Sequence, residues 1–439
     1  MSTGKFYIHT FGCQMNVHDS EQMAQILSDA GYVKTDEADR ADIIIVNTCS
    51  VRGKAAQKAY SQLGRLKRLR EKRPDLVIGV AGCLAQEHGT GFFRRAPYLD
   101  LVLGTHNIHR LPEMIEEINN TGSQVVDTSF HESVRSLGIR TLPPDGNVSA
   151  YVTIMQGCNN FCSYCIVPYV RGREESRAGG DIIDEIRFLA DNGIREVTLL
   201  GQNVNSYGST LSGDTDFPAL LRMVSKIDGV DRIRFTTSHP KDLSERLAGC
   251  FADLDNLCEH IHLPVQSGSD HVLKRMKRGY TAGEYLKKID MLKSACPDIS
   301  ITSDIIVGFP GERDSDFQKT IDLMKEVRFD NVFSFKYSDR RGTASEGYDG
   351  KVEEGVKSER LYELQALQES NSLEKNRCLE GIVKDVLIEG VSKNNDADIT
   401  GRTRGNKIVN LAGDIGLTGR TVRVRIVQAH MHSLRGEMV

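Results

Sequence analysis

The chain has 439 residues, enough for two to four domains of ordinary size. Its 39% hydrophobic and 26% charged residues are typical of a globular protein, and ten cysteines are too few for a disulfide scaffold. We expect neither a signal peptide nor a membrane helix, hence a cytoplasmic protein. The formal charge of −4 excludes a uniformly basic protein, although residues 377–439 carry ten Lys or Arg against seven Asp or Glu.

Three similar units open the chain, each an apolar run that ends in a cysteine and precedes a helical pattern. Nearly continuous Ile, Val and Leu runs alternating with helices predict a parallel sheet covered on both faces. Ligands of such sheets bind beyond the carboxyl ends of the strands, so we expect Cys13, Cys49 and Cys83 to share one edge. Without further information, buried packing is the plainer interpretation of these cysteines. The runs are KFYIHTFGC (5–13), ADIIIVNTC (41–49) and DLVIGVAGC (75–83), with LDLVLGT (99–105) as a fourth.

Composition and pattern divide the rest of the chain into three parts. A polar segment containing TLPPDG predicts a linker over 129–148, after a first domain over 1–128. Six apolar runs separated by helical patterns predict an incomplete (β/α)6 barrel in a domain over 149–376. Short alternating runs predict a small all-β barrel over 377–439, the class that includes oligonucleotide-binding modules. The fold class is therefore α/β with a small β-barrel at the end.

One motif carries metal chemistry by its spacing. Cys158, Cys162 and Cys165 form C-x3-C-x2-C where the first barrel strand ends. Structural zinc takes four ligands, and no fourth Cys or His follows at a matching spacing, which leaves only a zinc site with a remote ligand. On a [4Fe–4S] cluster, three thiolates leave one iron free for a non-protein ligand.

A triple cysteine at the mouth of a partial (β/α) barrel resembles the radical S-adenosylmethionine (radical SAM) enzymes, and further motifs resemble the methylthiotransferase family within them. The resemblance implies that Cys158, Cys162 and Cys165 are catalytic, holding the [4Fe–4S] cluster that cleaves S-adenosylmethionine. It further implies an auxiliary [4Fe–4S] cluster on Cys13, Cys49 and Cys83, and a C-terminal RNA-binding barrel called TRAM. The other motifs are GCQMN at Gly12, NTCS at Asn47, AGC at Ala81, PYVRGREESR at Pro168, LLGQNVNSYG at Leu199, LPVQSGS at Leu263, DIIVGFPGE at Asp304, YSDRRGTAS at Tyr337 and GRTRGNK at Gly401.

The residues around the first two cysteines are similar to one branch of this family. That branch adds a methylthio group to carbon 2 of N6-(dimethylallyl)adenosine in tRNA, next to the anticodon, and consumes two S-adenosylmethionine molecules. A methylthiotransferase for a ribosomal protein or for threonylcarbamoyl-adenosine tRNA is the alternative, and a non-catalytic iron–sulfur or zinc RNA-binding protein is the rival from another class. The implied partners are the tRNA anticodon loop, an electron donor such as a flavodoxin or ferredoxin, and a supplier of sulfur or clusters. We expect a monomer that does not bind membranes.

S-adenosylmethionine also needs groups for its ribose and adenine, which in (β/α) barrels come from the carboxyl ends of strands. Local hydrogen bonding is an equal alternative for Ser238 and Asp304, whereas Ser269 and Asp270 are better explained by a helix N-cap. Gly308 would act by close backbone approach. The full set of expected cofactor-binding residues is Gln202, Asn203, Ser238, Gln266, Asp304 and Gly308.

Basic residues suggest where RNA binds. The loop GRTRGNK is better placed for phosphate contact than the run GRLKRLREKR at 64–73, which is more typical of a solvated helix face. Arg171 and Arg173 directly follow the cluster loop, and we expect them to contact either the S-adenosylmethionine carboxylate or the RNA backbone. A target base must leave its stack, which is easier in a single-stranded loop. The predicted RNA contacts are Arg52, Arg171, Arg173, Arg402, Arg404 and Lys407; Cys250, Cys258, Cys296 and Cys378 are expected to be packing residues.

Overall fold

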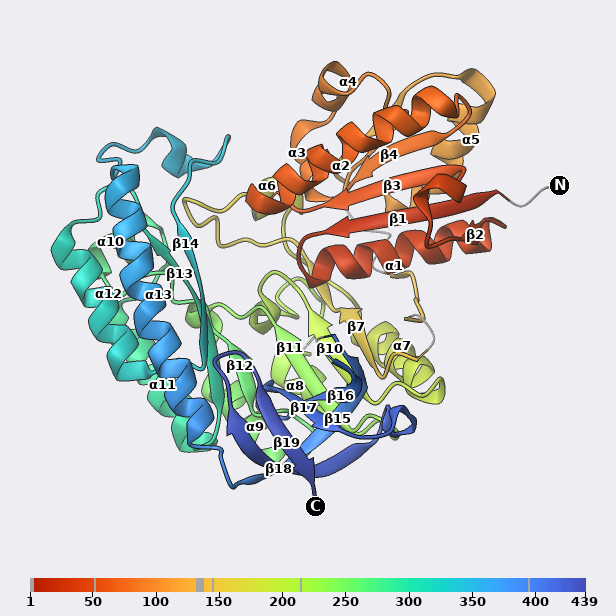
Figure 1. Ribbon diagram of the computed structural model, residues 1–439. Helices are drawn as coiled ribbons and strands as arrows, with labels where there is room; N and C mark the ends of the chain where they lie inside the picture. The colour runs from red at the N-terminus through yellow and green to blue at the C-terminus, as the bar shows by residue number, and fades with distance from the viewer. Residues whose placement is uncertain (1–3, 51–52, 132–137, 144–145, 214, 394) are drawn as a thin grey trace. The chain divides into compact units, whose positions relative to one another are not determined.

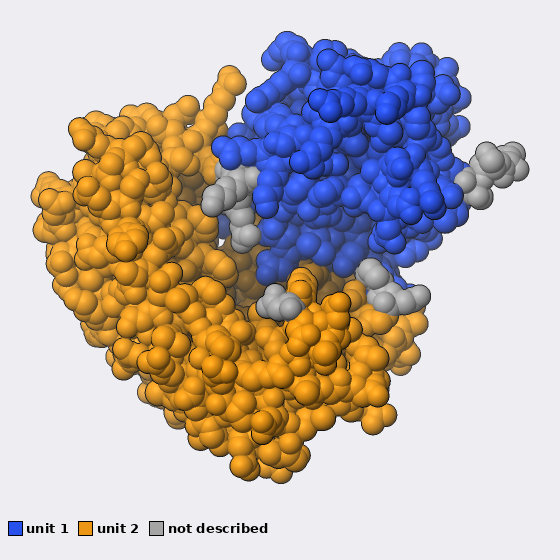
Figure 2. Space-filling model, viewed as in Figure 1, with its two compact units in different colours: residues 1–143, 153–159, 166–177 blue, residues 144–152, 160–165, 178–439 orange. Residues whose placement is uncertain are grey.

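The computed structural model describes residues 4–50, 53–131, 138–143, 146–213, 215–393 and 395–439. The chain divides into two compact units, drawn in different colours in Figure 2. The first comprises residues 1–143, 153–159 and 166–177, and the second 144–152, 160–165 and 178–439. The division into three domains and a linker stays a prediction, and residues 132–137 and 144–145 of that linker lie outside the described residues.

The first unit is built on a six-stranded parallel sheet with the order β2-β1-β3-β4-β5-β6 (Figure 1). Its long strands coincide with the apolar runs of the sequence, so the predicted parallel sheet is confirmed. The strands are β1 (Lys5–Phe11), β2 (Val33–Lys34), β3 (Ile43–Thr48), β4 (Val77–Ala81), β5 (Leu101–Leu103) and β6 (Val125–Asp127). The helices are α1 (Gln14–Asp29), α2 (Gly53–Lys72), α3 (Cys83–His88), α4 (Gly91–Arg95) and α5 (Leu111–Thr121), with the short α6 (Val167–Val170) from a later segment.

Strand alternation explains why both faces of this sheet are covered. Ile43 and Ile45 of β3 pack in one cluster with side chains of α1 and α5. Ile44 and Val46 pack in the other, with side chains of α2, α3 and α4. Because every residue of β3 is buried, its first four residues are all apolar rather than apolar at alternate positions. Polar and ligand-binding residues are therefore expected in the loops beyond the carboxyl ends of the strands.

The second unit contains the predicted partial barrel. Its six strands form two sheets, β11-β10-β7 and β12-β13-β14, whose β-strands alternate with helices along the chain. The strands are β7 (Ser149–Thr153, whose last residue belongs to the first unit), β10 (Glu196–Leu200), β11 (Arg232–Thr236), β12 (His260–His262), β13 (Ser300–Val307) and β14 (Asn331–Lys336). The helices are α7 (Gly179–Asp191), α8 (Phe217–Val224), α9 (Glu245–Asp253), α10 (Asp270–Arg275), α11 (Ala282–Ala295), α12 (Asp314–Val327) and α13 (Glu354–Arg377).

A closed five-stranded β-barrel ends the chain, as predicted, and belongs to the same unit. Its core is formed by inward-facing aliphatic side chains such as Val386, Val409 and Ile426. Arg234 of β11 donates hydrogen bonds to the carbonyls of Thr403 and Arg404 in the turn between β16 and β17, so this turn is anchored to the partial barrel. The strands are β15 (Val383–Ser392), β16 (Asn395–Thr403), β17 (Ile408–Ala412), β18 (Thr421–Ala429) and β19 (Leu434–Met438). Among the described residues, no helix combines the length and apolarity needed to cross a bilayer.

Candidate active site

Three cysteines of the first unit lie at the carboxyl ends of three adjacent strands. Cys13 follows β1 and is the N-cap of α1, Cys49 follows β3, and Cys83 follows β4 as the first residue of α3. The parallel register pairs Phe11 with Thr48, and Asn47 with Ala81, so the strands end at similar heights. The predicted common edge is therefore what the structure shows, while the cluster that these cysteines would hold stays a prediction.

Two buried asparagines pack behind this edge and explain the adjacent glycines. The Asn47 side-chain amide donates to the backbone carbonyl of Asn16 at 2.8 Å, and the side-chain Oδ1 of Asn16 accepts from the backbone N–H of Cys13 at 3.3 Å. A Cβ on Gly82 would lie 2.2 Å from the Asn47 Oδ1, and one on Gly12 would lie 2.3 Å from the Asn16 Oδ1. Both glycines also have positive φ values, +86° and +149°. The motifs GCQMN and NTC thus supply the amide groups that fix the cysteine loops.

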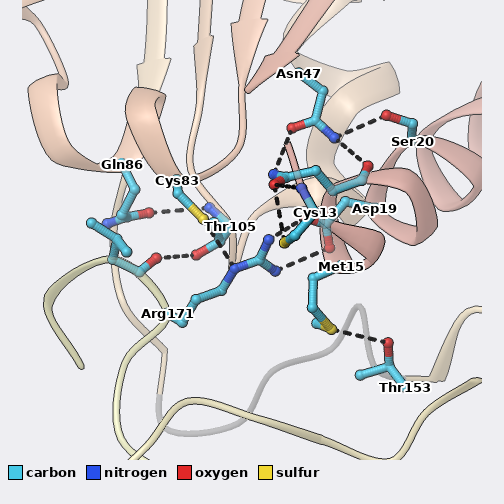
Figure 3. Close-up of polar contacts among 12 residues, drawn as sticks. Cys13, Met15, Asp19, Ser20, Asn47, Cys83, Gln86, Thr105, Thr153 and Arg171 are labelled. Atoms are coloured by element: carbon cyan, nitrogen blue, oxygen red, sulfur yellow. Dashed lines mark hydrogen bonds and ion pairs between the residues drawn. The ribbon is translucent and has the colours of Figure 1, made fainter. Parts of the chain in front are cut away.

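A buried arginine that sequence reasoning placed elsewhere faces the same edge. The Arg171 Nε donates to the Cys83 Sγ at 3.2 Å, and its two terminal nitrogens form an ion pair with the carboxylate of Asp19 (Figure 3). Its backbone carbonyl contacts the His106 ring at 3.0 Å, and the carbonyl before it accepts from the Thr105 hydroxyl at 2.7 Å. These contacts place the Arg171 side chain, 2% exposed, at the cysteine-bearing edge, and its predicted contact with RNA stays a prediction.

The thiols at this edge have unequal proton affinities. A hydrogen bond with Cys49 lowers the pKa of the Cys13 thiol to about 6, with help from the positive charge of Arg171. Burial raises the pKa of Cys83, and Arg171 opposes that increase. Since thiolates rather than thiols bind metals, the environment of Cys13 and the guanidinium near Cys83 both favour metal binding.

These residues fit a [4Fe–4S] cluster better than a single zinc ion. Zinc needs ligands that converge on one point, and no three His, Cys, Asp or Glu side chains do so anywhere in the described ranges. In a [4Fe–4S] cluster each cysteine binds a different iron, so the sulfurs need not converge. Cys83 also packs with Ile166 and Val170, which provide the apolar surroundings that limit water around such a group.

The second cysteine triplet is divided between the units. Cys158 belongs to the first, where its backbone N–H donates to the carbonyl of Gly172 at 3.2 Å. Cys162 and Cys165 belong to the second, joined by a backbone hydrogen bond of 2.9 Å in one tight turn. Gly157 has a φ of +81°, and a Cβ there would lie 2.0 Å from the Arg173 carbonyl oxygen, so glycine lets the loop turn into Cys158.

A second buried arginine contacts Cys162 and was missed in the sequence. The Arg278 Nη1 lies 3.4 Å from the Cys162 Sγ, and its other nitrogens donate to the Pro264 carbonyl at 2.7 Å and to the Tyr280 hydroxyl at 2.9 Å. Burial, together with the charge of Arg278, lowers the pKa of nearby His239 to about 2, so this ring stays neutral. No spacing rule links Arg278 to a cysteine 116 residues away.

Two expected cofactor-binding residues present buried polar atoms that lack partners. The Ser238 hydroxyl and the Gln266 Oε1 have no hydrogen-bond partner among the described residues. Gln266 has a positive φ of 73°, and its backbone pairs with that of β13 through Asp304 and Ile306. Because buried polar atoms are nearly always satisfied, these two favour a polar ligand at this place.

Other residues of that set have structural partners of their own. The Asn203 amide donates to Asp242 at 2.7 Å and accepts from the backbone of His239 at 3.1 Å, which ties two strand-end loops together. Gln202 is half-buried beside it. Gly308 has a φ of +71°, and a Cβ there would lie 2.3 Å from the Lys357 Cγ, so packing against α13 already requires glycine. The roles of all three toward S-adenosylmethionine stay predictions.

Asp304 lies in a polar and aromatic patch of the partial barrel. Its Oδ2 is 3.5 Å from the His262 Nε2 on the neighbouring strand. The register pairs Asp304 with Phe333 and Ile306 with Phe335, so these side chains share one face. Phe333 is 45% exposed and Phe335 41%, unusual for aromatic side chains on a barrel strand. The alternation in NVFSFK is the signal that could have identified them.

Ser269 and the remaining cysteines give a mixed outcome. Ser269 is the N-cap of α10, as predicted, but its hydroxyl donates to Asp316 at 2.6 Å instead of capping the helix. Cys250, Cys258 and Cys296 are buried, as expected for packing residues. Cys378 is exposed, so the packing prediction is wrong there, because it follows the last turn of α13.

Comparisons with known proteins identify the domains and the family of the chain. Family models match residues 5–104 (Uncharacterized protein family UPF0004), 152–324 (Radical SAM superfamily) and 377–439 (TRAM domain). The tRNA-2-methylthio-N(6)-dimethylallyladenosine synthase of Syntrophus aciditrophicus is 60% identical over 99% of this chain and 94% of its own length. The synthase of the same name from Geotalea uraniireducens is 52% identical over 98% of each chain. The chain belongs to the tRNA-2-methylthio-N(6)-dimethylallyladenosine synthase family.

A solved structure agrees at the level of the fold. The radical S-adenosylmethionine methyltransferase TsrM from Kitasatospora setae, with cobalamin and a [4Fe–4S] cluster bound, has a TM-score of 0.57 to this chain. The match covers 78% of this chain and 74% of that one at 14% identity, so it shows a shared fold alone. The expected methylthiotransferase family and the α/β fold class are confirmed.

An enzyme that acts on tRNA needs Arg or Lys side chains that are available to phosphates. Most of the predicted RNA contacts are instead paired with carboxylates of the chain. Arg404 donates from Nε to both carboxylate oxygens of Glu259 at 2.8 and 2.9 Å. Lys407 pairs with Asp330 at 3.0 Å, and Arg402 with Glu389 at 3.0 Å. Arg173 is exposed, and Arg52 lies outside the described residues. By contrast, three exposed arginines without an ion pair among the described residues lie on or beside β18: Arg420, Arg423 and Arg425.

Proposed function

We propose that this chain adds a methylthio group to carbon 2 of N6-(dimethylallyl)adenosine in tRNA, next to the anticodon. The observation that carries the proposal is 60% identity over 99% of the chain to a synthase named for that product. The arrangement of two cysteine triplets supports the same chemistry. With two [4Fe–4S] clusters and S-adenosylmethionine bound, such a site supplies reductive cleavage of one S-adenosylmethionine and sulfur methylated by another.

The residues of the chain hold and shield these groups. Cys158, Cys162 and Cys165 would bind the cluster that cleaves S-adenosylmethionine, and Cys13, Cys49 and Cys83 the auxiliary one. Ser238 and Gln266 offer partner-free polar atoms to the ribose or adenine. Burial of the surrounding side chains excludes water, which would otherwise quench a reactive intermediate.

Turnover on defined tRNA tests the proposal. The reconstituted enzyme is incubated with isopentenylated tRNA and, separately, with unmodified tRNA, and the nucleosides are analysed by mass spectrometry. Methylthiolated product from isopentenylated tRNA alone is the expected result. Product from unmodified tRNA alone, from threonylcarbamoyl-adenosine tRNA, or from a ribosomal protein would refute the substrate assignment. Anaerobic iron analysis should give about eight irons per chain, whereas a zinc protein would give none.

The tRNA itself is proposed to contact the exposed arginines on and beside β18. Phosphate contacts dominate the affinity of proteins for nucleic acids, and they need cations free of carboxylate partners. Arg420, Arg423 and Arg425 meet that requirement, whereas Arg404 and Lys407 are paired. The exposed Arg173 remains a candidate nearer the cluster loop.

The other partners follow from the chemistry. Cleavage of S-adenosylmethionine consumes electrons, so we propose a flavodoxin or ferredoxin as donor, and a separate supplier of sulfur or clusters. We further propose a cytoplasmic monomer, with pull-down of a reductant and size-exclusion chromatography as the tests. A dimer in solution would refute the monomer.

A further inference from the structure

Each cysteine triplet has one buried arginine that donates to one of its sulfurs. Arg171 donates to Cys83 at 3.2 Å and Arg278 to Cys162 at 3.4 Å. The two arginines are 2% and 5% exposed, so neither contact is a chance meeting of surface side chains. The same arrangement thus occurs twice, in unrelated segments of the chain.

The orientation of Arg171 is fixed from both sides. Its terminal nitrogens are held by the Asp19 carboxylate, itself buried, and a planar guanidinium held in this way has its Nε–H direction determined. Figure 3 shows the guanidinium between the carboxylate of Asp19 and the sulfur of Cys83. The backbone around Arg171 is bonded to the loop after β5 through Thr105 and His106. Helix α1, the end of β4 and the loop after β5 therefore all contact Arg171.

Stability alone does not account for this arrangement. Replacing a buried ion pair by apolar residues of similar volume is often neutral or stabilising, so the pair alone is weak evidence for a role in stability. The ion pair with Asp19 uses the two terminal nitrogens of Arg171, so the contact of Nε with the Cys83 sulfur is separate from it. Hydrogen bonds to ligand sulfurs and nearby charge are, however, among the factors that set the reduction potential of an iron–sulfur cluster.

We propose that Arg171 is a positioning residue for the auxiliary cluster, orienting the Cys83 thiolate and raising the reduction potential of the cluster by its hydrogen bond and charge. Asp19 anchors the guanidinium and neutralises part of its charge. This inference rests on the proposed function, because it requires that Cys13, Cys49 and Cys83 hold a cluster. Arg278 provides an internal contrast, since no carboxylate among the described residues pairs with it.

The experiment isolates the auxiliary cluster in the full-length chain. Cys158, Cys162 and Cys165 are replaced by Ala, the protein is reconstituted anaerobically, and iron content, midpoint potential and the electron paramagnetic resonance spectrum of the reduced state are measured. About four irons per chain are expected in this parent. A parent that binds no cluster would refute the proposed function, independently of any result on Arg171.

Arg171→Lys is then introduced into that parent. Lys keeps the charge, but its single nitrogen cannot make the two-point contact with the Asp19 carboxylate and donate to Cys83 at the same time. We expect a more negative midpoint potential and an altered spectrum at unchanged iron content. Loss of iron with a folded apoprotein would also support positioning. The parental potential and spectrum, or an apoprotein that does not fold, would overturn the proposal, since the role would then be structural.

Two further variants complete the design. The pair Asp19→Asn with Arg171→Met removes both charges without leaving one buried alone, and should shift the potential in the same direction. Arg70→Lys is the matched control, because Arg70 forms a two-point contact with Asp100 at 3.0 and 3.2 Å near the opposite end of β4. It should leave the potential unchanged, and an equal shift in this control would overturn the proposal.

Discussion

Arg404, in the turn between β16 and β17, could contact RNA or anchor the turn to the rest of the fold, and its contacts distinguish these two roles. Arg404 donates to both oxygens of Glu259 and to the carbonyl of Leu257 at 2.7 Å. Its side chain is 26% exposed and that of Glu259 30%, so solvent weakens but does not cancel the pair. Replacing Arg404 by Gln removes the charge and most of these bonds. The structure therefore predicts a loss of stability rather than a simple loss of RNA affinity.

The magnitude follows from the bonds that are lost. A hydrogen bond to a charged group contributes about 1.5–3 kcal/mol, and partial exposure reduces this to a total of about 1–3 kcal/mol for Arg404→Gln. At about 2–4 °C per kcal/mol, the midpoint Tm should fall by roughly 2–12 °C. Thermal unfolding of the apoprotein, followed by circular dichroism, measures this change.

Arg420→Gln is the matched comparison on the same barrel. Arg420 is exposed and has no ion pair in the described part of the chain. The free energy of unfolding of the variant should therefore stay within about 0.5 kcal/mol of the parent. Its affinity for tRNA should fall, and the slope of log affinity against log salt should shrink by about 1. An unchanged Tm with weakened RNA binding in Arg404→Gln would refute the structural reasoning.

The remaining predictions concern the cysteine sites and one partly buried histidine. Cys158→Ala should abolish cleavage of S-adenosylmethionine, whereas Cys13→Ala should spare it and stop methylthiolation; product from the Cys13 variant in a nucleoside assay would refute the auxiliary site. Gly82→Ala should cost about 2–5 kcal/mol, because its Cβ would lie 2.2 Å from the Asn47 Oδ1 at a φ of +86°; chemical denaturation and iron content measure this, and parental stability would contradict it. Burial lowers the pKa of His260 to about 3, so the unfolded chain takes up a proton first as the pH falls below 6.5. The free energy of unfolding should therefore fall by up to about 1.4 kcal/mol per pH unit between pH 6.5 and 3. The fall should be smaller in His260→Gln. Chemical denaturation at a series of pH values measures both.

The sequence predicted what depends on local pattern. Apolar runs ending in cysteine identified the strands and the shared edge of Cys13, Cys49 and Cys83, because parallel strands bring their carboxyl ends together. The spacing of C-x3-C-x2-C likewise predicts a metal motif without any tertiary information, and that site stays a prediction. The closed barrel followed from short alternating runs over the last 63 residues, 377–439.

Long-range charge pairing was out of reach of the same reasoning. In the sequence, GRTRGNK is typical of an unpaired basic loop. Its Arg404 is neutralised by Glu259, 145 positions earlier, and its Lys407 by Asp330, 77 positions earlier. Arg171 was interpreted as a contact for RNA or the S-adenosylmethionine carboxylate because it follows the cluster motif. Its buried partner Asp19 is 152 residues away. A basic residue is available to a polyanion only if no acid of the fold reaches it, and spacing does not contain that information.

The two buried arginines extend this argument to catalysis. Cysteine spacing predicts which residues would bind iron, but the potential of a cluster depends on what else faces its sulfurs. The charge of Arg171 is balanced by Asp19, whereas Arg278 is surrounded by neutral groups such as Tyr280 and the Pro264 carbonyl. Other factors being equal, the uncompensated charge near Cys162 should favour the reduced state of its cluster more than the balanced pair does near Cys83. A more positive potential makes that cluster easier to reduce but a weaker donor of its electron. The potentials of the two clusters, measured separately, would test the expected difference.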